Sequence, residues 1–334
     1  MEPGGASWLP GRMEPHGAGW LPGLVRGTIP VIPRARAVAN PFQEAGALRV
    51  LLVNDDGVYS PGIQTLRAAL EERTGWEVYV VAPDRQRSAS GHAITLHKPL
   101  YLDPVEIPGA RSPVYAVSGT PADCTKIGLL AVLPGPCDLV ISGINRGGNL
   151  GFDVLYSGTV SAAIEGVIMG VPAIAVSLAA WQEPDYGPAA RFTARLAELV
   201  AREGLPPGVL LNVNVPPLPE ERIAGVVLTV LSRRMYRDRF EKRLDPRGRP
   251  YYWLAGEPVQ EPPSVETDVG AVRAGYISIT PLHLQLSDRE AMARLEAWRP
   301  QLEAGLGSSR RPAAGTDDAE AQAQPAQVQV RPQT

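Results

Sequence analysis

The stretch 48–57 reads LRVLLVNDDG and decides the fold of the chain. Its first six residues form an apolar run with the length and composition of a buried strand. The carboxyl end of such a strand is where open α/β sheets bind ligands, and Gly57 permits a sharp turn there. Asp55 and Asp56 would raise each other's pKa unless a divalent cation that prefers hard oxygen ligands kept both ionised. The four residues Asn54–Gly57 alone leave open an Asx turn in which Asn54 or Asp56 caps the next helix.

Short β-rich runs alternate with helical patterns after this stretch, which predicts βαβ units. Pro61 stands where a first helical turn tolerates proline, and Ile63, Leu66 and Leu70 recur at helical spacing. Further strands are expected at 76–82, 94–101, 114–117, 138–142, 172–178, 208–215, 225–231 and 275–286, with helices after Thr120, after Ser157 and over 189–201. We therefore expect a Rossmann-like, three-layer α/β/α fold around a largely parallel sheet.

The composition indicates a globular protein that acts on small molecules. A hydrophobic content of 44% suffices for a sizeable core, and a net charge of −3 gives no general electrostatic reason to bind nucleic acid. No apolar run approaches the roughly 18 residues that a membrane span requires. Cys124 and Cys137 have neither the spacing of a zinc site nor the density of a disulfide scaffold. We expect reduced thiols, a cytoplasmic location, no membrane association and no stable nucleic-acid complex.

Both ends of the chain look like additions to one folded domain. Residues 1–11 recur almost intact as residues 13–23, and two Pro/Gly-rich copies are too few to build a repeat fold. Residues 306–334 form a low-complexity Ala/Gln/Pro tract. We expect a disordered extension over 1–46, a folded domain over 47–305 and a disordered tail over 306–334.

A basic, aromatic segment over about 232–256 interrupts the α/β pattern. Its centre, Asp245–Gly248 (DPRG), has the composition of a type I turn, so we expect a protruding β-hairpin arm. Acidic residues interrupt the arginines, and the aromatic residues suit packing against a second subunit. A dimerisation arm is therefore the preferred interpretation, with a nucleic-acid surface as the alternative.

Three polar loops follow strands of the expected sheet. They carry Asp55 and Asp56, Ser88, and Asn145, and the carboxyl ends of parallel strands meet in one crevice. Two carboxylates, a hydroxyl and an amide carbonyl form an all-oxygen set suited to Mg²⁺ or Mn²⁺. The helix that begins near Ser157 would present its N–H groups to phosphate. These features together predict a metal-dependent hydrolase in which an activated water attacks a phosphoester.

Five ordered motifs of the chain closely resemble the SurE family of survival-protein nucleotidases. The motifs are Val53–Gly57 (VNDDG), Ala82–Ser88 (APDRQRS), Ser118–Cys124 (SGTPADC), Ser142–Asn145 (SGIN) and Tyr156–Val160 (YSGTV). The segment 276–282 (YISITPL) continues the match, which spans about residues 48–300.

The resemblance implies a 5′/3′-nucleotidase that hydrolyses nucleoside monophosphates with one divalent cation, Mg²⁺ or Mn²⁺, per subunit. The metal ligands implied are Asp55, Asp56, Ser88 and Asn145, of which Asp55 and Asp56 are the catalytic residues. The phosphate-binding residues implied are Asn145, Ser157, Gly158 and Thr159. The resemblance also implies a C-terminal helix and a homodimer that exchanges the hairpin and the C-terminal segment, with pairing of dimers into tetramers left open.

Two alternative functions stay open on the residues alone. A haloacid-dehalogenase-type phosphatase also places acidic residues after its first strand, but it separates them by one residue, which adjacent Asp55 and Asp56 do not reproduce. A nucleotide-sensing module would bind metal and phosphate without turnover. His92, in the Ser88 loop, is an additional candidate for contact with a leaving group, and Glu165 is expected to serve packing or a cap.

Overall fold

The computed structural model describes residues 48–180, 182, 184–233, 236–258 and 264–304. The extension expected over 1–46 and the tail expected over 306–334 lie outside these ranges, and both stay predictions. The described residues up to Leu282 and those from His283 onward form two compact units.

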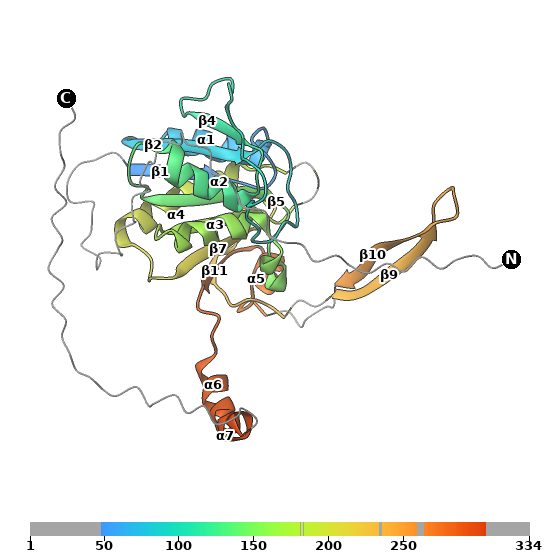
Figure 1. Ribbon diagram of the computed structural model, residues 1–334. Helices are drawn as coiled ribbons and strands as arrows, with labels where there is room; N and C mark the ends of the chain where they lie inside the picture. The colour runs from blue at the N-terminus through green and yellow to red at the C-terminus, as the bar shows by residue number, and fades with distance from the viewer. Residues whose placement is uncertain (1–47, 181, 183, 234–235, 259–263, 305–334) are drawn as a thin grey trace, which may run out of the picture. The chain divides into compact units, whose positions relative to one another are not determined.

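A sheet of nine strands, counted within the described residues, forms the centre of the first unit, in the order β3-β4-β2-β1-β5-β6-β7-β11-β8 (Figure 1). Its strands are β1 (Leu48–Val53), β2 (Trp76–Pro83), β3 (Leu102–Pro104), β4 (Val114–Val117), β5 (Leu139–Arg146), β6 (Ala173–Leu178), β7 (Val209–Val215), β8 (Gly225–Leu228) and β11 (Tyr276–His283). Strand β1 pairs in parallel with β2 on one side and β5 on the other. The chain thus builds outward from β1 in both directions, which places a topological switch point between β1 and β5.

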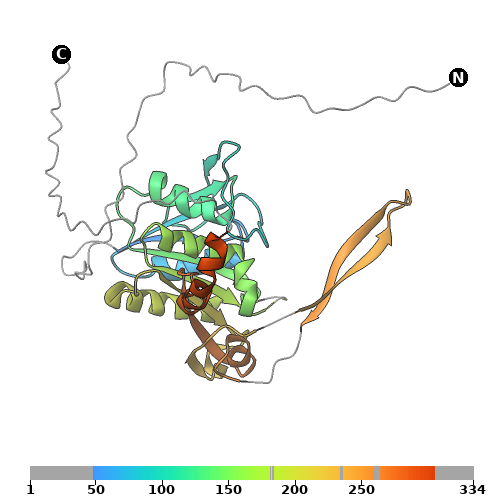
Figure 2. The ribbon, with the colours of Figure 1, turned by 60° about the horizontal axis from the view of Figure 1, so that its bottom comes forward.

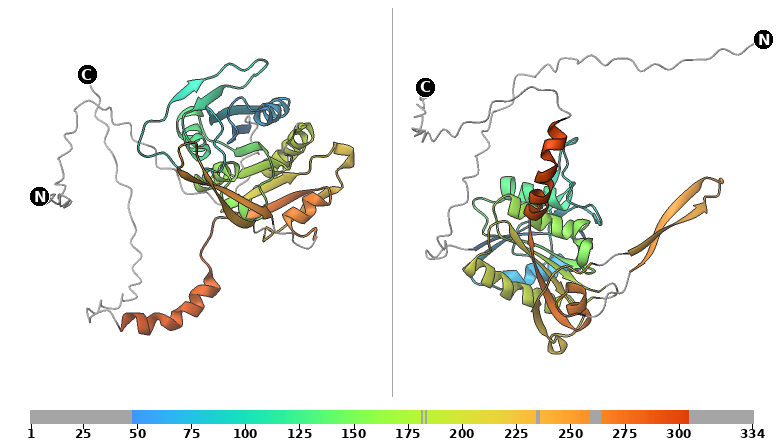
Figure 3. Two further views of the ribbon diagram at one scale, coloured as in Figure 1. Left: turned by 90° about the vertical axis from the view of Figure 1, so that its right-hand side faces the viewer. Right: turned by 90° about the horizontal axis from the view of Figure 1, so that it is seen from below.

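Helices cover both faces of this sheet (Figure 3). Helices α1 (Pro61–Glu71) and α4 (Gly187–Glu203) pack together, and α2 (Pro121–Ile127) packs with α3 (Gly158–Ile168) on the other face. The core on the α1 side is aliphatic, with Ile63, Leu66 and Leu70 fully buried as the helical spacing predicts. The expected three-layer α/β/α arrangement is confirmed.

Helix α2 begins as the sequence predicts, with Thr120 as its cap and Pro121 as its first residue. The Thr120 Oγ1 accepts a hydrogen bond from Asp123 N (3.1 Å), and Asp123 Oδ2 accepts one from Thr120 N (2.9 Å). This reciprocal capping box satisfies backbone donors that the first turn of a helix leaves unpaired.

The strand expected over 94–101 does not form. Thr95 N donates to Asp123 Oδ1 (2.9 Å), and Ala93 O accepts from Thr120 Oγ1 (2.7 Å). The start of helix α2 therefore binds a backbone group at the beginning of this segment, Thr95 N, and one just before it, Ala93 O. The edge strand on this side of the sheet is instead the short strand β3, which pairs antiparallel with β4.

The hairpin expected from the basic, aromatic segment forms a separate two-stranded antiparallel sheet (Figure 2). Its strands are β9 (Tyr236–Leu244) and β10 (Pro250–Pro258). Asp245 closes the turn between them, since its Oδ1 accepts from Arg247 N (2.9 Å) and Arg249 N (2.8 Å). Helix α5 (Asp268–Arg273) then leads back into β11.

The second unit is helical where it is described. It contains α6 (Arg289–Leu295), η5 (Glu296–Trp298) and α7 (Arg299–Glu303), which confirms the expected C-terminal helix. The first unit has further short helical turns, η2 (Gly128–Val132), η3 (Gly151–Leu155) and η4 (Glu220–Arg222). Among the described residues, we find no helix with the length and apolarity needed to span a membrane.

Candidate active site

Neighbouring residues of the turn after β1 have different roles. Asn54 is fully buried, and its Nδ2 donates to Gly57 O (2.9 Å) and to Ser60 Oγ (2.7 Å). Its Oδ1 accepts from Gly57 N (3.2 Å), which completes an Asx turn. Because Asn54 holds the turn, Asp55 and Asp56 are available for another role. The Asx turn and the pair of carboxylates therefore coexist.

A pocket of about 350 Å³ lies at the carboxyl ends of β1, β2 and β5. It brings together five of the predicted site residues, which are Asp55, Asp56, Ser88, Asn145 and Ser157. The remaining lining residues are Gln86, Ala89, Arg146, Gly148, Asn149, Leu150, Asp153, Tyr156 and Ala179. Gly158 and Thr159, the other predicted residues, occupy the first turn of α3 and are not part of the lining. The pocket forms because β1 lies between β2 and β5, so that the loops after these strands are neighbours.

Asp55 is the most buried carboxylate of the pocket, with 5% of its surface exposed. The Thr159 hydroxyl donates to Asp55 Oδ1, and Arg87 N donates to Asp55 O (2.7 Å). Burial raises the pKa of Asp55 to about 6; the Thr159 hydrogen bond acts in the opposite direction and the charge of Asp56 adds to the increase. Ionised Asp55 is therefore costly in the folded protein unless a positive charge lies nearby.

Asp56 connects two of the other loops. Its Oδ2 accepts from Arg146 N (3.0 Å), and Gln86 Nε2 lies 3.4 Å from its Oδ1 and donates to Ser88 Oγ (2.8 Å). Burial raises the pKa of Asp56, while the backbone N–H and the charge of Arg146 lower it. Gln86 was not predicted as a site residue, because a glutamine in a polar loop carries no distinguishing pattern.

Asn145 enters the pocket through an irregularity in β5. The register of β5 against β6 shifts between Ser142 and Asn145. Gly143 has a φ of +138°, and a Cβ at this position would lie 2.4 Å from Val176 O, so the chain needs glycine here. The Asn145 Nδ2 donates to Gly147 O (2.8 Å), which leaves the amide oxygen as the atom suited to a cation.

The hydroxyls at the start of α3 are engaged within the protein. Ser157 Oγ caps the helix by accepting from Val160 N (3.0 Å), and the hydroxyl of the fully buried Thr159 binds Asp55. The Thr159 hydroxyl donor is used by Asp55, whereas an anion at this end of the helix could still meet the Ser157 hydroxyl and backbone N–H groups. The phosphate-binding roles of Asn145, Ser157, Gly158 and Thr159 stay predictions.

Comparison with known proteins identifies the family. The family model described as Survival protein SurE matches residues 50–238. The chain belongs to the SurE family. The match begins in β1 and contains each of the predicted metal ligands and the start of α3. Membership sets aside the haloacid-dehalogenase alternative.

Several SurE relatives align with three quarters of this chain and nearly the whole of their own length. The protein named 5′-nucleotidase SurE from Symbiobacterium thermophilum is 58% identical over 249 residues, covering 75% of this chain and 97% of that one. The protein of the same name from Pelotomaculum thermopropionicum is 54% identical over 253 residues, covering 75% and 94%. The crystal structure of the SurE protein from Aquifex aeolicus has a TM-score of 0.67 at 42% identity, covering 75% of this chain and 99% of that one.

The donor set of this SurE pocket fits a hard divalent cation. Within the described ranges, no three His, Cys, Asp or Glu side chains gather as a metal site. The pocket instead combines the two carboxylates with the oxygens of Ser88 and Asn145, which are ligand types that Mg²⁺ and Mn²⁺ prefer. Burial raises the pKa of both carboxylates, and a dication bound between them would favour their ionised forms.

His92 lies outside the residues that line the SurE pocket. Its Nε2 is 2.9 Å from Oε2 of the buried Glu165, whose Oε1 pairs with Lys126 Nζ at 2.5 Å. Glu165 therefore joins the Ser88 loop to helices α2 and α3. Contact between His92 and a leaving group gains no support from this geometry.

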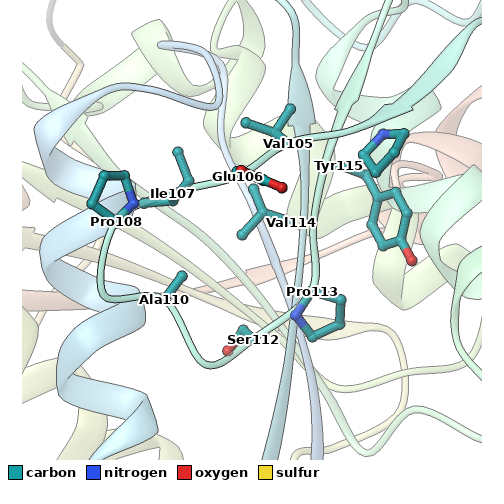
Figure 4. A pocket seen from close by; sticks show the side chains of 10 residues that line it. Val105, Glu106, Ile107, Pro108, Ala110, Ser112, Pro113, Val114 and Tyr115 are labelled. Carbon is teal, nitrogen blue, oxygen red and sulfur yellow. The ribbon is translucent and has the colours of Figure 1, made fainter.

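A larger hollow of about 680 Å³ lies over the loop between β3 and β4 (Figure 4). It is lined by residues of one continuous stretch, Pro104–Tyr115, among which Glu106 is the charged member. A hollow within a single loop with one carboxylate lacks the converging polar groups of an active site. The chemistry, rather than the volume, identifies the smaller pocket as the candidate active site.

Proposed function

We propose that this SurE-family chain is a phosphomonoesterase that hydrolyses nucleoside 5′- and 3′-monophosphates, with one divalent cation, Mg²⁺ or Mn²⁺, per subunit. The observation that carries the proposal is the convergence of Asp55, Asp56, Ser88 and Asn145 in one pocket beside the start of α3. Relatives that are 46–58% identical carry the name 5′-nucleotidase SurE, which supports the same activity.

The four oxygen-bearing side chains would hold the cation. When bound, the cation would neutralise phosphoryl charge and lower the pKa of a water that attacks phosphorus. The backbone N–H groups at the start of α3 would hold phosphate oxygens, since the positive, N-terminal end of the helix dipole favours negative charge. Tyr156 lines the pocket and is 68% exposed, so its ring offers a surface for the nucleoside.

Release of inorganic phosphate tests the proposal directly. AMP, GMP and 3′-AMP should each yield phosphate with Mg²⁺ or Mn²⁺, and a chelator such as EDTA should stop the release. Ribose 5-phosphate, which lacks a base, should react with a higher KM. Tight nucleotide binding without any phosphate release would favour the sensing module, and release that EDTA does not affect would contradict the metal dependence.

Thr159→Val should weaken the metal site without removing a ligand. The variant deletes the hydroxyl that orients Asp55 and that lowers its pKa, so we expect metal affinity to fall about 10- to 100-fold. The measurement is the Mn²⁺ concentration that gives half-maximal phosphate release. Thr159→Ser keeps a hydroxyl and is the control. Equal metal affinity in the Val and Ser variants would show that this hydrogen bond does not matter.

We propose that the hairpin packs against a second copy of the chain. Phe240 and Leu254 are cross-strand partners on one face of the hairpin, and they are 68% and 64% exposed. Leu244 and Tyr252 share this face and are also exposed. A lone two-stranded hairpin is marginally stable in water, so this face needs a partner. Pairing of dimers into tetramers stays an alternative.

The double variant Phe240→Ser/Leu254→Ser should shift the protein from dimer to monomer, because it removes the centre of the exposed apolar face. Size-exclusion chromatography with light scattering measures the mass at several concentrations. Arg243→Ser, a change on the opposite face of the same hairpin, should leave the dimer intact. A wild-type protein that is monomeric at all concentrations would contradict the proposal.

We further propose a cytoplasmic location and no stable nucleic-acid complex. Cys124 and Cys137 are both free thiols, which suits a reducing compartment. The net charge of −3 gives no general attraction to phosphate backbones.

A further inference from the structure

The wall of the pocket formed by residues 148–150 is fixed from behind by buried polar groups. Asn149 O accepts from Nδ2 of both Asn212 and Asn214 (2.9 Å each), and Asn149 N donates to Asn214 Oδ1 (2.8 Å). Asn149 Nδ2 donates to Ser177 Oγ (2.7 Å). Strands β6 and β7 thus hold one end of this wall.

Asp268 holds the other end. It is the first residue of α5, is fully buried, and its Oδ2 accepts from Gly151 N (2.7 Å). Its Oδ1 accepts from Ser232 N (2.9 Å) and from Val269 N (2.8 Å). A buried carboxylate is stable only while its donors stay in place, because an unpaired buried charge is costly.

Ser232 lies where the chain leaves β8 for the hairpin, just before β9 begins at Tyr236. The segment before it is bound to the same region, since Asp268 N donates to Val230 O (3.1 Å) and Val230 N donates to Glu266 O (3.0 Å). Asp268 therefore binds the base of the hairpin with one carboxylate oxygen and the pocket wall with the other. A displacement of Ser232 would leave part of a buried charge unpaired and would loosen Gly151.

We propose that Asp268 is a positioning residue that couples the base of the hairpin to the wall of the nucleotide pocket. The proposal rests on the nucleotidase function proposed above. The coupled segment leads into Tyr156, which lines the pocket, whereas the predicted metal ligands lie on other loops. The coupling should therefore act on nucleotide binding more than on the chemical step. Because coupling is reciprocal, a bound nucleotide should also restrain the base of the hairpin.

The first test is Asp268→Asn in the full chain. Asparagine offers one acceptor oxygen and places an NH₂ against a backbone N–H, so one of the two bridging hydrogen bonds is lost. We expect KM for AMP to rise about 5- to 50-fold, with kcat within about threefold of wild type. The matched control is Asp138→Asn. Asp138 lies just before the amino end of β5, away from the pocket, and its carboxylate also accepts from a backbone donor, Arg49 N (2.7 Å). This control should keep the wild-type KM.

The second test needs no variant, so it can be carried out even if Asp268→Asn fails to fold. Amide hydrogen exchange of the wild-type protein is followed with Mn²⁺ and a phosphonate analogue of AMP that cannot be hydrolysed. We expect slower exchange both in the pocket segment 148–156 and in the hairpin base 228–233. Protection of 148–156 without any change at 228–233 would overturn the proposal, as would an unchanged KM in Asp268→Asn. A wild-type protein that releases no phosphate would defeat the nucleotidase function itself, and the inference would fall with it.

Discussion

Asp56→Asn is expected to lower kcat/KM for AMP by about 1000-fold or more, because it removes one of the two charges that would hold the cation. The substitution is nearly isosteric, and the amide oxygen can still accept from Arg146 N. Burial raises the pKa of Asp56, which means that the folded protein disfavours its ionised form. The neutral amide should therefore leave the thermal stability of the metal-free protein equal or higher.

Phosphate release and Mn²⁺ titration calorimetry measure the loss, and thermal unfolding in EDTA measures the stability. Asp103→Asn, which alters an exposed carboxylate on β3, is the control and should behave as wild type. Activity within about tenfold of wild type in Asp56→Asn would contradict a role for this carboxylate in metal binding.

Gly158→Ala is the second substitution with a large expected effect. An added Cβ would lie 2.7 Å from Asp55 Cβ, 3.0 Å from Asp55 Oδ2 and 3.0 Å from Pro121 Cγ. Asp55 cannot move away easily, since residues 50–54 before it are fully buried and its carbonyl binds Arg87 N. We expect kcat/KM to fall about 100-fold and the free energy of unfolding to fall by about 1–3 kcal/mol.

Gly166→Ala separates these two effects. It overpacks the same helix, since its Cβ would lie 3.0 Å from Val140 Cγ2 and 3.4 Å from Ala173 Cβ, but it touches no pocket residue. Chemical denaturation and phosphate release should show lost stability with retained activity. An equal loss of activity in Gly158→Ala and Gly166→Ala would indicate that folding, rather than the position of Asp55, explains the effect.

Most elements of the fold were predictable because their signals are local. The run 48–53 is apolar except for Arg49, as suits a strand covered on both faces, and β1 forms there. Thr120 and Pro121 begin helix α2 through interactions between residues that are close in the sequence. The convergence of Asp55, Ser88 and Asn145 followed from one rule, that the carboxyl ends of parallel strands share an edge of the sheet.

The prediction of a strand over 94–101 was wrong. Alternation of apolar residues is necessary for a half-buried strand, but it does not supply a neighbouring strand to pair with. Thr95 N in this segment binds Asp123, and the carbonyl of Ala93 just before it binds Thr120; both partners come later in the chain. Leu96 ends 75% exposed. Competition between a sheet ladder and a helix start cannot be judged from the periodicity of one segment.

Contacts between distant residues were the part that sequence reasoning missed. Thr159 and Asp55 are 104 residues apart, and Asp268 and Gly151 are 117 apart, so no spacing rule connects them. One signal was present, since Asn212 and Asn214 fall on the same face of an otherwise apolar strand. Buried amides at that spacing indicate a polar network that needs a partner.

The sequence by itself determined most of the strands and helices, where the polar loops follow the strands, and that oxygen-bearing side chains gather at one edge of the sheet. These features depend on side-chain periodicity and turn chemistry, which act over a few residues. Only the tertiary structure decided that Thr159 orients Asp55, that Gln86 lies between Asp56 and Ser88, and that Asp268 joins the hairpin base to the pocket wall. Such pairings depend on which buried donor lies within hydrogen-bond distance of which acceptor, and packing of the whole chain sets that distance.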